Sequence, residues 1–236
     1  MQRIDKLISS QMNLSRKQVH TLIRSGAVIV DGQICKSVDT KFDPQKADIS
    51  VNGHKLNYKE HIYIMLNKPD GVLSASNDKR AKTVVDLVPT ELYRDGLFPA
   101  GRLDKDTTGL LIITDDGDFA HNMLSPKKNV YKIYKAKLSG NITDDVIHNF
   151  ERGVIFADGT QCLPAKLWTT SEYGEDVGFV QICEGKFHQV KKMFLACGLT
   201  VEKLERLQIG KLRLDNSLKL GECRELTDIE LKEIFL

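Results

Sequence analysis

The chain contains no long apolar run among its 236 residues. No stretch approaches the roughly 20 residues that a membrane-spanning helix needs. The N-terminal segment MQRIDKLISSQMNLSRK also lacks the apolar core of a signal peptide. We therefore expect a cytoplasmic protein with no membrane partner. Hydrophobic residues still make up 41% of the chain, which leaves ample material for the core of a globular protein.

Paired cysteines and cofactor-binding motifs are also absent from the sequence. No two of the cysteines have CxxC spacing, and no histidine cluster accompanies them; they are Cys35, Cys162, Cys183, Cys197 and Cys223. This pattern argues against a zinc site and against a disulfide framework, so we expect reduced, mostly packed thiols. The sequence has no internal repeat and no GxGxxG, Walker A, HExxH or Gly-x-Ser-x-Gly pattern.

Basic charge is concentrated near the N-terminus, although the net charge of the whole chain is only +2. Residues 1–58 contain nine Lys and Arg against five Asp and Glu, whereas the remaining residues contain 25 basic and 27 acidic side chains. A basic module attached to a nearly neutral body is typical of electrostatic docking to nucleic acid. A solvated basic face gives the same count, so charge alone leaves both interpretations open.

The first 35 residues have the pattern of two short helices followed by a hairpin. Apolar residues recur at helical spacing in residues 4–8 and 19–23. Ser15 is a suitable N-cap for the second helix, and Gly26 suits its C-terminal end. Asp31-Gly32, between two apolar segments, predicts a tight β-hairpin turn.

This helix–helix–hairpin order resembles the S4 RNA-binding domain over roughly residues 1–50. The matching motifs are Arg3-Ile4-Asp5-Lys6-Leu7, Ser15-Arg16, and residues 23–32 with the sequence IRSGAVIVDG. The resemblance implies RNA contacts from basic side chains of this module, for which the candidates are Arg3, Arg16, Lys17 and Arg24. The alternative is a basic helical hairpin used for packing or for protein contact.

Residues 52–61 are polar and are expected to form a linker. Beyond them, β-branched and aromatic content predicts strands at 62–67, 97–103, 109–116, 131–138, 165–170 and 177–185. Helices are expected at 119–124, 144–150 and 188–198, and a terminal helix is expected to begin with a capping box at Thr227. We therefore predict an α+β fold with a mixed, mainly antiparallel sheet flanked by helices. The expected domains are 1–58 and 59–236.

The densest chemical signal is the segment Gly101–Leu111, which places Asp104 in a polar loop between two apolar strands. A carboxylate held at a strand end can project into a cleft. The alternative is structural, since Asp and Thr are common turn residues. Tyr134 lies within a predicted strand and could line the same cleft or belong to the core. Lys191 lies early in a predicted helix. It is either a residue of the site or a solvated surface lysine.

Three segments together with the S4-like module resemble the pseudouridine synthases, in particular the RsuA family. They are Asn67-Lys68-Pro69-Asp70-Gly71, the segment Gly101–Gly117 (GRLDKDTTGLLIITDDG), and the segment Glu184–Phe194 (EGKFHQVKKMF). The resemblance covers essentially the whole chain. It implies an enzyme that detaches uracil from C1′ of its ribose, turns it and rejoins it through C5. Such an exchange needs no cofactor and no metal.

The resemblance also implies roles for individual residues. Asp104 corresponds to the family's nucleophile, Lys191 to the cation that pairs with it, and Tyr134 to the aromatic residue that packs against the target base. A nucleophile in a desolvated cleft needs a nearby cation to remain ionised. Arg102 matches a position that contacts RNA near the flipped nucleotide, with a plain salt bridge as the alternative. Lys127 and Lys128 precede the strand of Tyr134 and are further candidates for RNA contact.

The expected partner is ribosomal RNA or a small-subunit assembly intermediate, and we expect a monomer. Thr114–Gly117, His121 and Ser125-Pro126 are most similar to family members that act on the small subunit. By resemblance, the target is uridine 516 of 16S rRNA. One alternative is a synthase of the same family that acts on 23S rRNA. Another is a non-catalytic S4-domain assembly factor, although the presence of all three expected catalytic residues argues against it.

Overall fold

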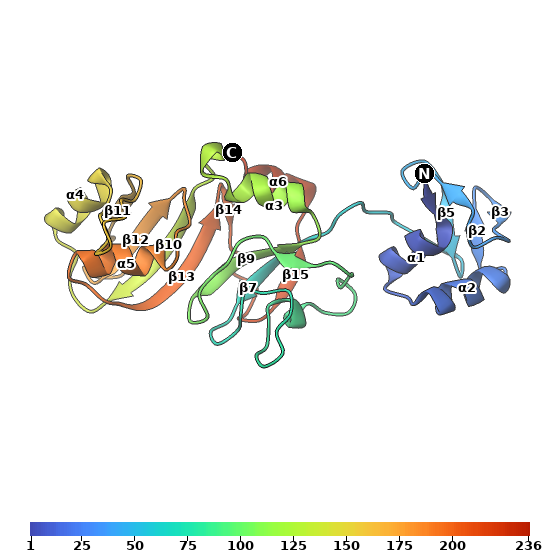
Figure 1. The fold of residues 1–236 in the computed structure, drawn as a ribbon, viewed down its shortest axis with the longest axis horizontal. Helices are drawn as coiled ribbons and strands as arrows, with labels where there is room; N and C mark the ends of the chain where they lie inside the picture. The colour runs from blue at the N-terminus through green and yellow to red at the C-terminus, as the bar shows by residue number, and fades with distance from the viewer. The chain divides into compact units, whose positions relative to one another are not determined.

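The computed structural model covers residues 1–236 and divides the chain into two compact units (Figure 1). Unit 1 consists of Met1–Ile62 and Pro89–Leu97, and unit 2 of Tyr63–Val88 and Phe98–Leu236. None of the helices combines the length and apolar character needed to cross a membrane. All five cysteines are free, as expected, and Cys35, Cys162 and Cys183 are buried.

Unit 1 is built from two helices and several short strands. Its elements are β1 (Gln2–Arg3), α1 (Ile4–Met12), α2 (Arg16–Arg24), β2 (Val28–Val30), β3 (Gln33–Ile34), β4 (Lys41–Phe42), β5 (Ile49–Val51) and β6 (His54–Lys55). β1 pairs with β4, and the other strands form a sheet in the order β3-β2-β5-β6. Leu7, Ile8 and Val19 are fully buried in its core, so the helical spacing read from the sequence is confirmed.

Local signals in unit 1 are confirmed at both ends of α2 and at the first hairpin. The Ser15 hydroxyl accepts a hydrogen bond from Gln18 N, and Gln18 Oε1 accepts one from Ser15 N at 2.9 Å. This reciprocal pair is a capping box. Gly26 follows the helix with φ +75°, and Asp31 and Gly32 have positive φ angles between β2 and β3. Both positions need a residue that tolerates the left-handed region.

The linker expected at residues 52–61 is wrong at its start. Asn52 and Gly53 have φ angles of 52° and 78° and form the turn between β5 and β6. Asn-Gly is itself a favoured hairpin turn. The polar composition of this segment therefore concealed one more strand pair, and β6 extends the sheet of unit 1 to Lys55.

Unit 2 contains a nine-stranded sheet with helices beside it. Its elements are β7 (Tyr63–Lys68), η1 (Val85–Leu87), β8 (Phe98–Pro99), β9 (Thr108–Thr114), α3 (Gly117–Leu124), η2 (Pro126–Lys128), β10 (Lys132–Leu138), α4 (Asp144–Arg152), β11 (Lys166–Trp168), β12 (Val177–Ile182), α5 (Gln189–Ala196), β13 (Val201–Ile209), β14 (Leu212–Arg213), β15 (Cys223–Glu225) and α6 (Asp228–Glu233). The strand order is β11-β12-β10-β13-β9-β7-β15, with β14 beside β13 and β8 beside β9. Only β13 and β9 are parallel, which confirms a mixed, mainly antiparallel α+β fold.

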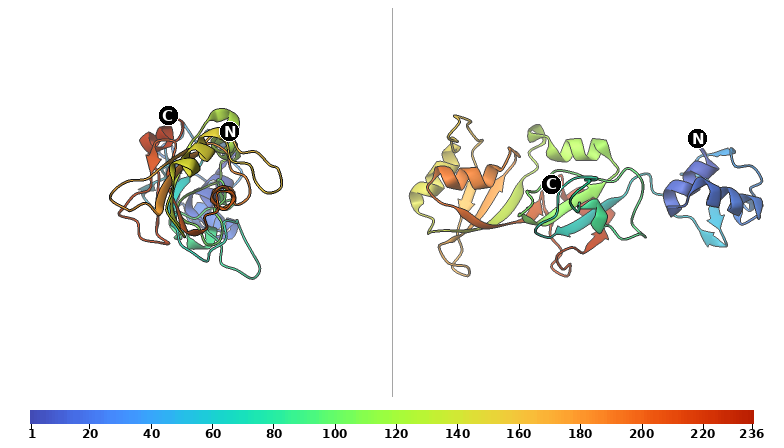
Figure 2. Two further views of the ribbon diagram at one scale, coloured as in Figure 1. Left: turned by 90° about the vertical axis from the view of Figure 1, so that its left-hand side faces the viewer. Right: turned by 60° about the horizontal axis from the view of Figure 1, so that its bottom comes forward.

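The helices of unit 2 pack on the two halves of this sheet (Figures 1 and 2). α4 and α5 meet through Phe150 and Phe194, whose ring centroids are 4.9 Å apart, and Phe194 reaches Gly178 of β12. α3 contributes Ala120 and Met123 to the core of the other half. The capping box predicted at Thr227 is present and opens α6.

Two strand predictions in unit 2 need correction. The segment 97–103 was expected to be one strand, but only Phe98 and Pro99 pair with β9. Gly101, at φ +95°, turns the chain away from the ladder. The longest strand, β13, was not predicted at all. Its sequence VEKLERLQI carries several charges, which concealed that Leu204, Arg206 and Ile209 are buried.

The parallel contact between β13 and β9 is short and close. Only Glu205–Thr108 and Arg206–Gly109 are in register. Gly109 has φ +98°, and a Cβ atom added there would lie 2.3 Å from the backbone oxygen of Arg206. The two halves of the sheet therefore join at a point where only glycine fits.

We predict that Gly109→Ala destabilises the protein more than Gly71→Ala. Gly71 has φ +81° but open space around it, so its substitution adds only the backbone cost of about 1–2 kcal/mol. Gly109→Ala adds a steric cost of about 1–3 kcal/mol at the strand junction. Thermal midpoints of the two full-length variants measure the difference. Equal midpoints would show that the junction has room for a side chain.

Candidate active site

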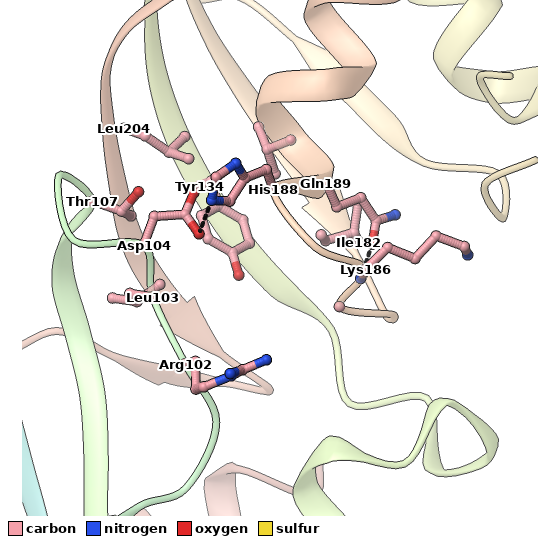
Figure 3. Close-up of a pocket in the computed structure, with 12 residues that line it drawn as sticks. Arg102, Leu103, Asp104, Thr107, Tyr134, Ile182, Lys186, His188, Gln189 and Leu204 are labelled. Atoms are coloured by element: carbon pink, nitrogen blue, oxygen red, sulfur yellow. Dashed lines mark hydrogen bonds and ion pairs between the residues drawn. The ribbon is translucent and has the colours of Figure 1, made fainter. Parts of the chain in front are cut away.

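A cavity of about 790 Å³ opens in unit 2 beside the junction of β13 and β9. Its walls come from the loop 101–105, from β10 and β13, and from the segment 184–188 that leads into α5. A smaller pocket adjoins this cavity and shares Arg102, Asp104 and Tyr134 with it, among other residues (Figure 3). The cavity therefore collects side chains from two of the recognised motifs, Gly101–Gly117 and Glu184–Phe194, together with Tyr134.

Asp104 faces two cationic or potentially cationic side chains from the start of α5. Its Oδ2 lies 3.2 Å from Lys191 Nζ, and its Oδ1 lies 3.5 Å from His188 Nε2. Figure 3 shows His188 directed at the Asp104 carboxylate. The Asp104 side chain is 24% exposed, so solvent still reaches the carboxylate in the absence of a ligand.

Lys191 is shared between two carboxylates. Its Nζ donates a hydrogen bond to Asp106 Oδ1 at 2.5 Å in addition to its contact with Asp104. Burial lowers the pKa of Lys191, but the hydrogen bonds to Asp106 and Asp104 outweigh it, so the net pKa is raised. The same hydrogen bond lowers the pKa of Asp106. Lys191 is therefore held in its charged form beside Asp104.

The floor of the pocket is apolar next to Asp104. Tyr134 of β10, Ile182 of β12 and Leu204 of β13 present their side chains to it, and all three are more than nine-tenths buried. Figure 3 shows the Tyr134 ring beside the Asp104 carboxylate, with its hydroxyl pointing away from it. A planar ring lying on this floor would have the carboxylate at its edge.

The loop that carries Asp104 is anchored by a buried lysine. Lys68 is fully buried, and its Nζ donates hydrogen bonds to Pro69 O (3.0 Å), Lys105 O (3.1 Å) and Thr107 O (2.9 Å). Burial lowers the pKa of Lys68 to about 8. Gly71 N also donates to Lys105 O at 2.9 Å. The Asn67–Gly71 element therefore fixes the backbone that directly follows Asp104.

Comparison with known proteins identifies this arrangement. A sequence model of the RNA pseudouridylate synthase family matches residues 62–196, and the S4 domain model matches residues 2–46. The chain belongs to the RNA pseudouridine synthase family. It is 46% identical to the uncharacterized RNA pseudouridine synthase YtzG of Bacillus subtilis, over 97% of this chain and 96% of that protein.

Other synthases align over almost the full length. The chain is 38% identical to ribosomal small subunit pseudouridine synthase A of Vibrio cholerae, over 99% of both chains. It is 35% identical to ribosomal large subunit pseudouridine synthase B of Bacillus subtilis, over 99% of this chain and 96% of the other. A crystal structure of a pseudouridylate synthase, 34% identical, covers 99% of this chain and is itself fully covered, with a TM-score of 0.69. RsuA-like membership and the α+β fold are thus confirmed.

The structure of the synthase brings together Asp104, Tyr134, Lys191 and Arg102. Arg102 is exposed at the cavity. Lys127 and Lys128 are exposed on η2, directly after Pro126, which lines the cavity. The other candidates for RNA contact lie in unit 1, on β1 and α2; they are Arg3, Arg16, Lys17 and Arg24, all exposed. The guanidinium of Arg3 is hydrogen-bonded to Asp5 at 2.8 and 3.0 Å.

Sequence reasoning missed several residues of the synthase site. Asp106 and His188 belong to the motifs that were recognised, but neither was assigned a role. His188 has a positive φ of 53° at the N-cap of α5, which aims its ring at Asp104. Lys68 lies in a recognised motif as well, whereas Arg206 lies in the strand that was not predicted. No local sequence pattern distinguishes a buried charged residue within a strand from an exposed one.

We predict that Lys68→Met lowers the free energy of unfolding by about 2 kcal/mol or more. Each buried carbonyl left without a donor costs about 1–3 kcal/mol. Pro69 O and Thr107 O lose the Lys68 donor, whereas Lys105 O keeps the donor Gly71 N. The rate of pseudouridine formation should also fall, since the Asp104 loop loses the hydrogen bonds that hold it in place. Lys105→Met is the matched control, because Lys105 is an exposed lysine of the same loop. A thermal midpoint no lower in Lys68→Met than in Lys105→Met would contradict this role.

Proposed function

We propose that this synthase converts uridine to pseudouridine in ribosomal RNA, with Asp104 as the nucleophile. The observation that carries the proposal is the ion pair between Asp104 and Lys191, 3.2 Å apart at the edge of an apolar floor that contains Tyr134. A carboxylate can form and then break a bond to the nucleotide. Lys191 supplies the positive charge that keeps such a carboxylate ionised as the ligand displaces water.

Tyr134 is proposed to pack against the target base. Its ring is nearly buried in the floor beside Asp104, with Ile182 and Leu204 around it. A base in folded RNA must leave its stack to reach this position, which costs a few kcal/mol. Arg102, exposed at the cavity, is proposed to contact the RNA near the flipped nucleotide and offset part of that cost.

The cavity walls have the charge that a polyanion requires. Five Lys and Arg side chains line the cavity against two acidic ones. Lys127 and Lys128 continue this basic character on η2 beside it. The exposed cations, Arg102, Lys127 and Lys128, are proposed to bind phosphates, while specificity comes from unpaired bases and the shape of the RNA.

We further propose that residues 1–58 form a docking domain and residues 59–236 the catalytic domain. Arg16, Lys17 and Arg24 are exposed on α2 and available for phosphate contact. All residues of the site come from unit 2 of one chain, so a monomer suffices for catalysis.

The proposed target is uridine 516 of 16S rRNA, in free RNA or in a small-subunit assembly intermediate. The support is the similarity of residues 114–126 to small-subunit enzymes. Part of that segment is structural, since Asp116 caps α3 through Phe119 N and accepts a 2.6 Å hydrogen bond from the Tyr63 hydroxyl. A 23S target is therefore kept as the second candidate, favoured by the 35% identity to large subunit synthase B.

The first test maps pseudouridine in 16S and 23S rRNA from cells with and without the gene. The expected result is the loss of one pseudouridine, at position 516 of 16S rRNA, and its return with the wild-type gene. Asp104→Asn should not restore it, because an amide cannot act as the nucleophile; turnover should fall at least about 1,000-fold. Restoration of the modification by a folded Asp104→Asn variant would exclude Asp104 as nucleophile. Loss of a 23S site would instead select the second candidate.

A second prediction separates the two carboxylates that share Lys191. Lys191→Met leaves Asp104 without its close cation, so the single-turnover rate should fall about 100-fold or more, with a much smaller change in RNA affinity. Asp106→Asn is the matched control. It removes the competing partner of Lys191 and should leave the rate within about threefold of wild type. An unchanged rate in Lys191→Met would show that Asp104 does not depend on it.

A further inference from the structure

Two buried cations line the active-site cavity without a carboxylate partner. They are Lys132 of β10 and Arg206 of β13, which are 5% and 4% exposed. Lys132 Nζ donates to Met123 O at 3.3 Å and to Cys183 O at 3.4 Å. Arg206 Nε donates to Leu110 O at 2.7 Å and Nη1 to the Tyr134 hydroxyl at 3.5 Å, while Nη2 is buried without any partner.

No anion in the protein neutralises these two charges. Glu184 is the only acidic residue besides Asp104 that lines the cavity. It is already paired with Lys186, and it accepts hydrogen bonds from Gln189 Nε2 at 2.7 Å and from Leu163 N at 2.8 Å. Burial, together with the repulsion from Arg206, lowers the pKa of Lys132 to about 8. Two like charges held out of water without a carboxylate partner are costly, so an anion that enters the cavity is stabilised by both.

The proposed reaction creates such an anion for part of its course. When a carboxylate oxygen of Asp104 bonds to C1′ and the C1′–N1 bond breaks, the electron pair of that bond leaves with the base, and uracil becomes an anion with charge on N1, O2 and O4. C5 of the turned base then bonds to C1′ as the bond from C1′ to Asp104 breaks and the carboxylate is released. The proton on C5 is lost, and N1 takes up a proton. The base is neutral before the first step and after the last. A cation placed beside the uracil anion stabilises this intermediate, and the transition states that precede and follow it, more than it stabilises the neutral substrate.

We propose that Lys132 and Arg206 form a cationic floor that stabilises the uracil anion while it is detached from the ribose. This inference rests on the proposed function. The Tyr134 hydroxyl connects the apolar surface beside Asp104 with the two buried cations. It points away from Asp104 in Figure 3, and Arg206 Nη1 is its neighbour. A uracil that packs on Tyr134 with its ribose at Asp104 therefore has a carbonyl edge beside the cationic floor.

A backbone phosphate fits this position less well than the base does. Phosphates lie at the surface of folded RNA, and the exposed cations at the cavity, Arg102, Lys127 and Lys128, are the ones within their reach. Lys132 and Arg206 lie on the sheet itself and are almost completely buried. In such a water-poor site, fixed positive charge acts on a developing anion far more strongly than at the surface.

The test measures C1′–N1 cleavage in a single turnover at saturating RNA, with Arg206→Gln and Lys132→Met in the full chain. Each should slow cleavage of a uridine substrate about 100- to 1,000-fold, with little change in Kd. The loss should be clearly smaller on the same RNA with 5-fluorouridine at the target, because fluorine stabilises the departing anion by itself. Arg206→Lys keeps the charge and should recover part of the rate. Arg213→Gln is the matched control, an exposed arginine of the neighbouring strand β14 outside the cavity, and should match wild type.

Three results would overturn the proposal. A raised Kd with a smaller salt slope and a normal saturated rate would identify a phosphate site instead. An equal loss on both substrates with a lowered thermal midpoint would assign a structural role. An unchanged rate would remove any role in the reaction. If Arg206→Gln does not fold, Arg206→Lys and Lys132→Met carry the same comparison. A wild-type protein that forms no pseudouridine in any rRNA would instead contradict the proposed function itself.

Discussion

The close approach of β13 to β9 at Gly109 is the constraint on which the site depends. At this point Arg206 lies against Gly109, and its side chain reaches Leu110 O. The same strand β9 begins directly after the Asp104 loop, and the same strand β13 begins shortly after α5, which carries Lys191. Because the two strands meet side by side, Asp104 and Lys191, which are 87 residues apart in the chain, come within 3.2 Å. A side chain at position 109 would push these elements apart.

Three cations in and around the cavity differ in how many of their hydrogen bonds the protein completes. Lys68 beneath the loop is satisfied by backbone carbonyls, Lys191 by two carboxylates, and Arg206 only in part. The first of these holds the loop, the second pairs with Asp104, and the third is the one that we propose to face the anionic base. Cations of one site thus have different consequences according to the number of their hydrogen bonds that the protein itself completes.

The sequence predicted those features that depend on neighbouring residues. The capping boxes at Ser15 and Thr227 and the Asp31-Gly32 turn are local patterns, and all are confirmed. Tyr134 was correctly placed within a strand because residues 131–138 are rich in aromatic and β-branched side chains. β13 escaped prediction, since its charged residues, Arg206 among them, conceal a half-buried strand. The contacts of Lys191 with both Asp104 and Asp106 also could not be predicted, because they depend on the packing of distant segments.

The topology of unit 2 also sets when the enzyme can become competent during its own synthesis. β7, at the start of the unit, pairs on one side with β15 at residues 223–225. β9 pairs with β13, which is synthesised only with residues 201–209. Loops of roughly 100 residues or more must close before these contacts form, which makes such pairings slow and late. Unit 1, by contrast, draws nearly all of its residues from the first 62. A nascent chain thus completes its basic N-terminal unit well before Asp104 and Lys191 can meet.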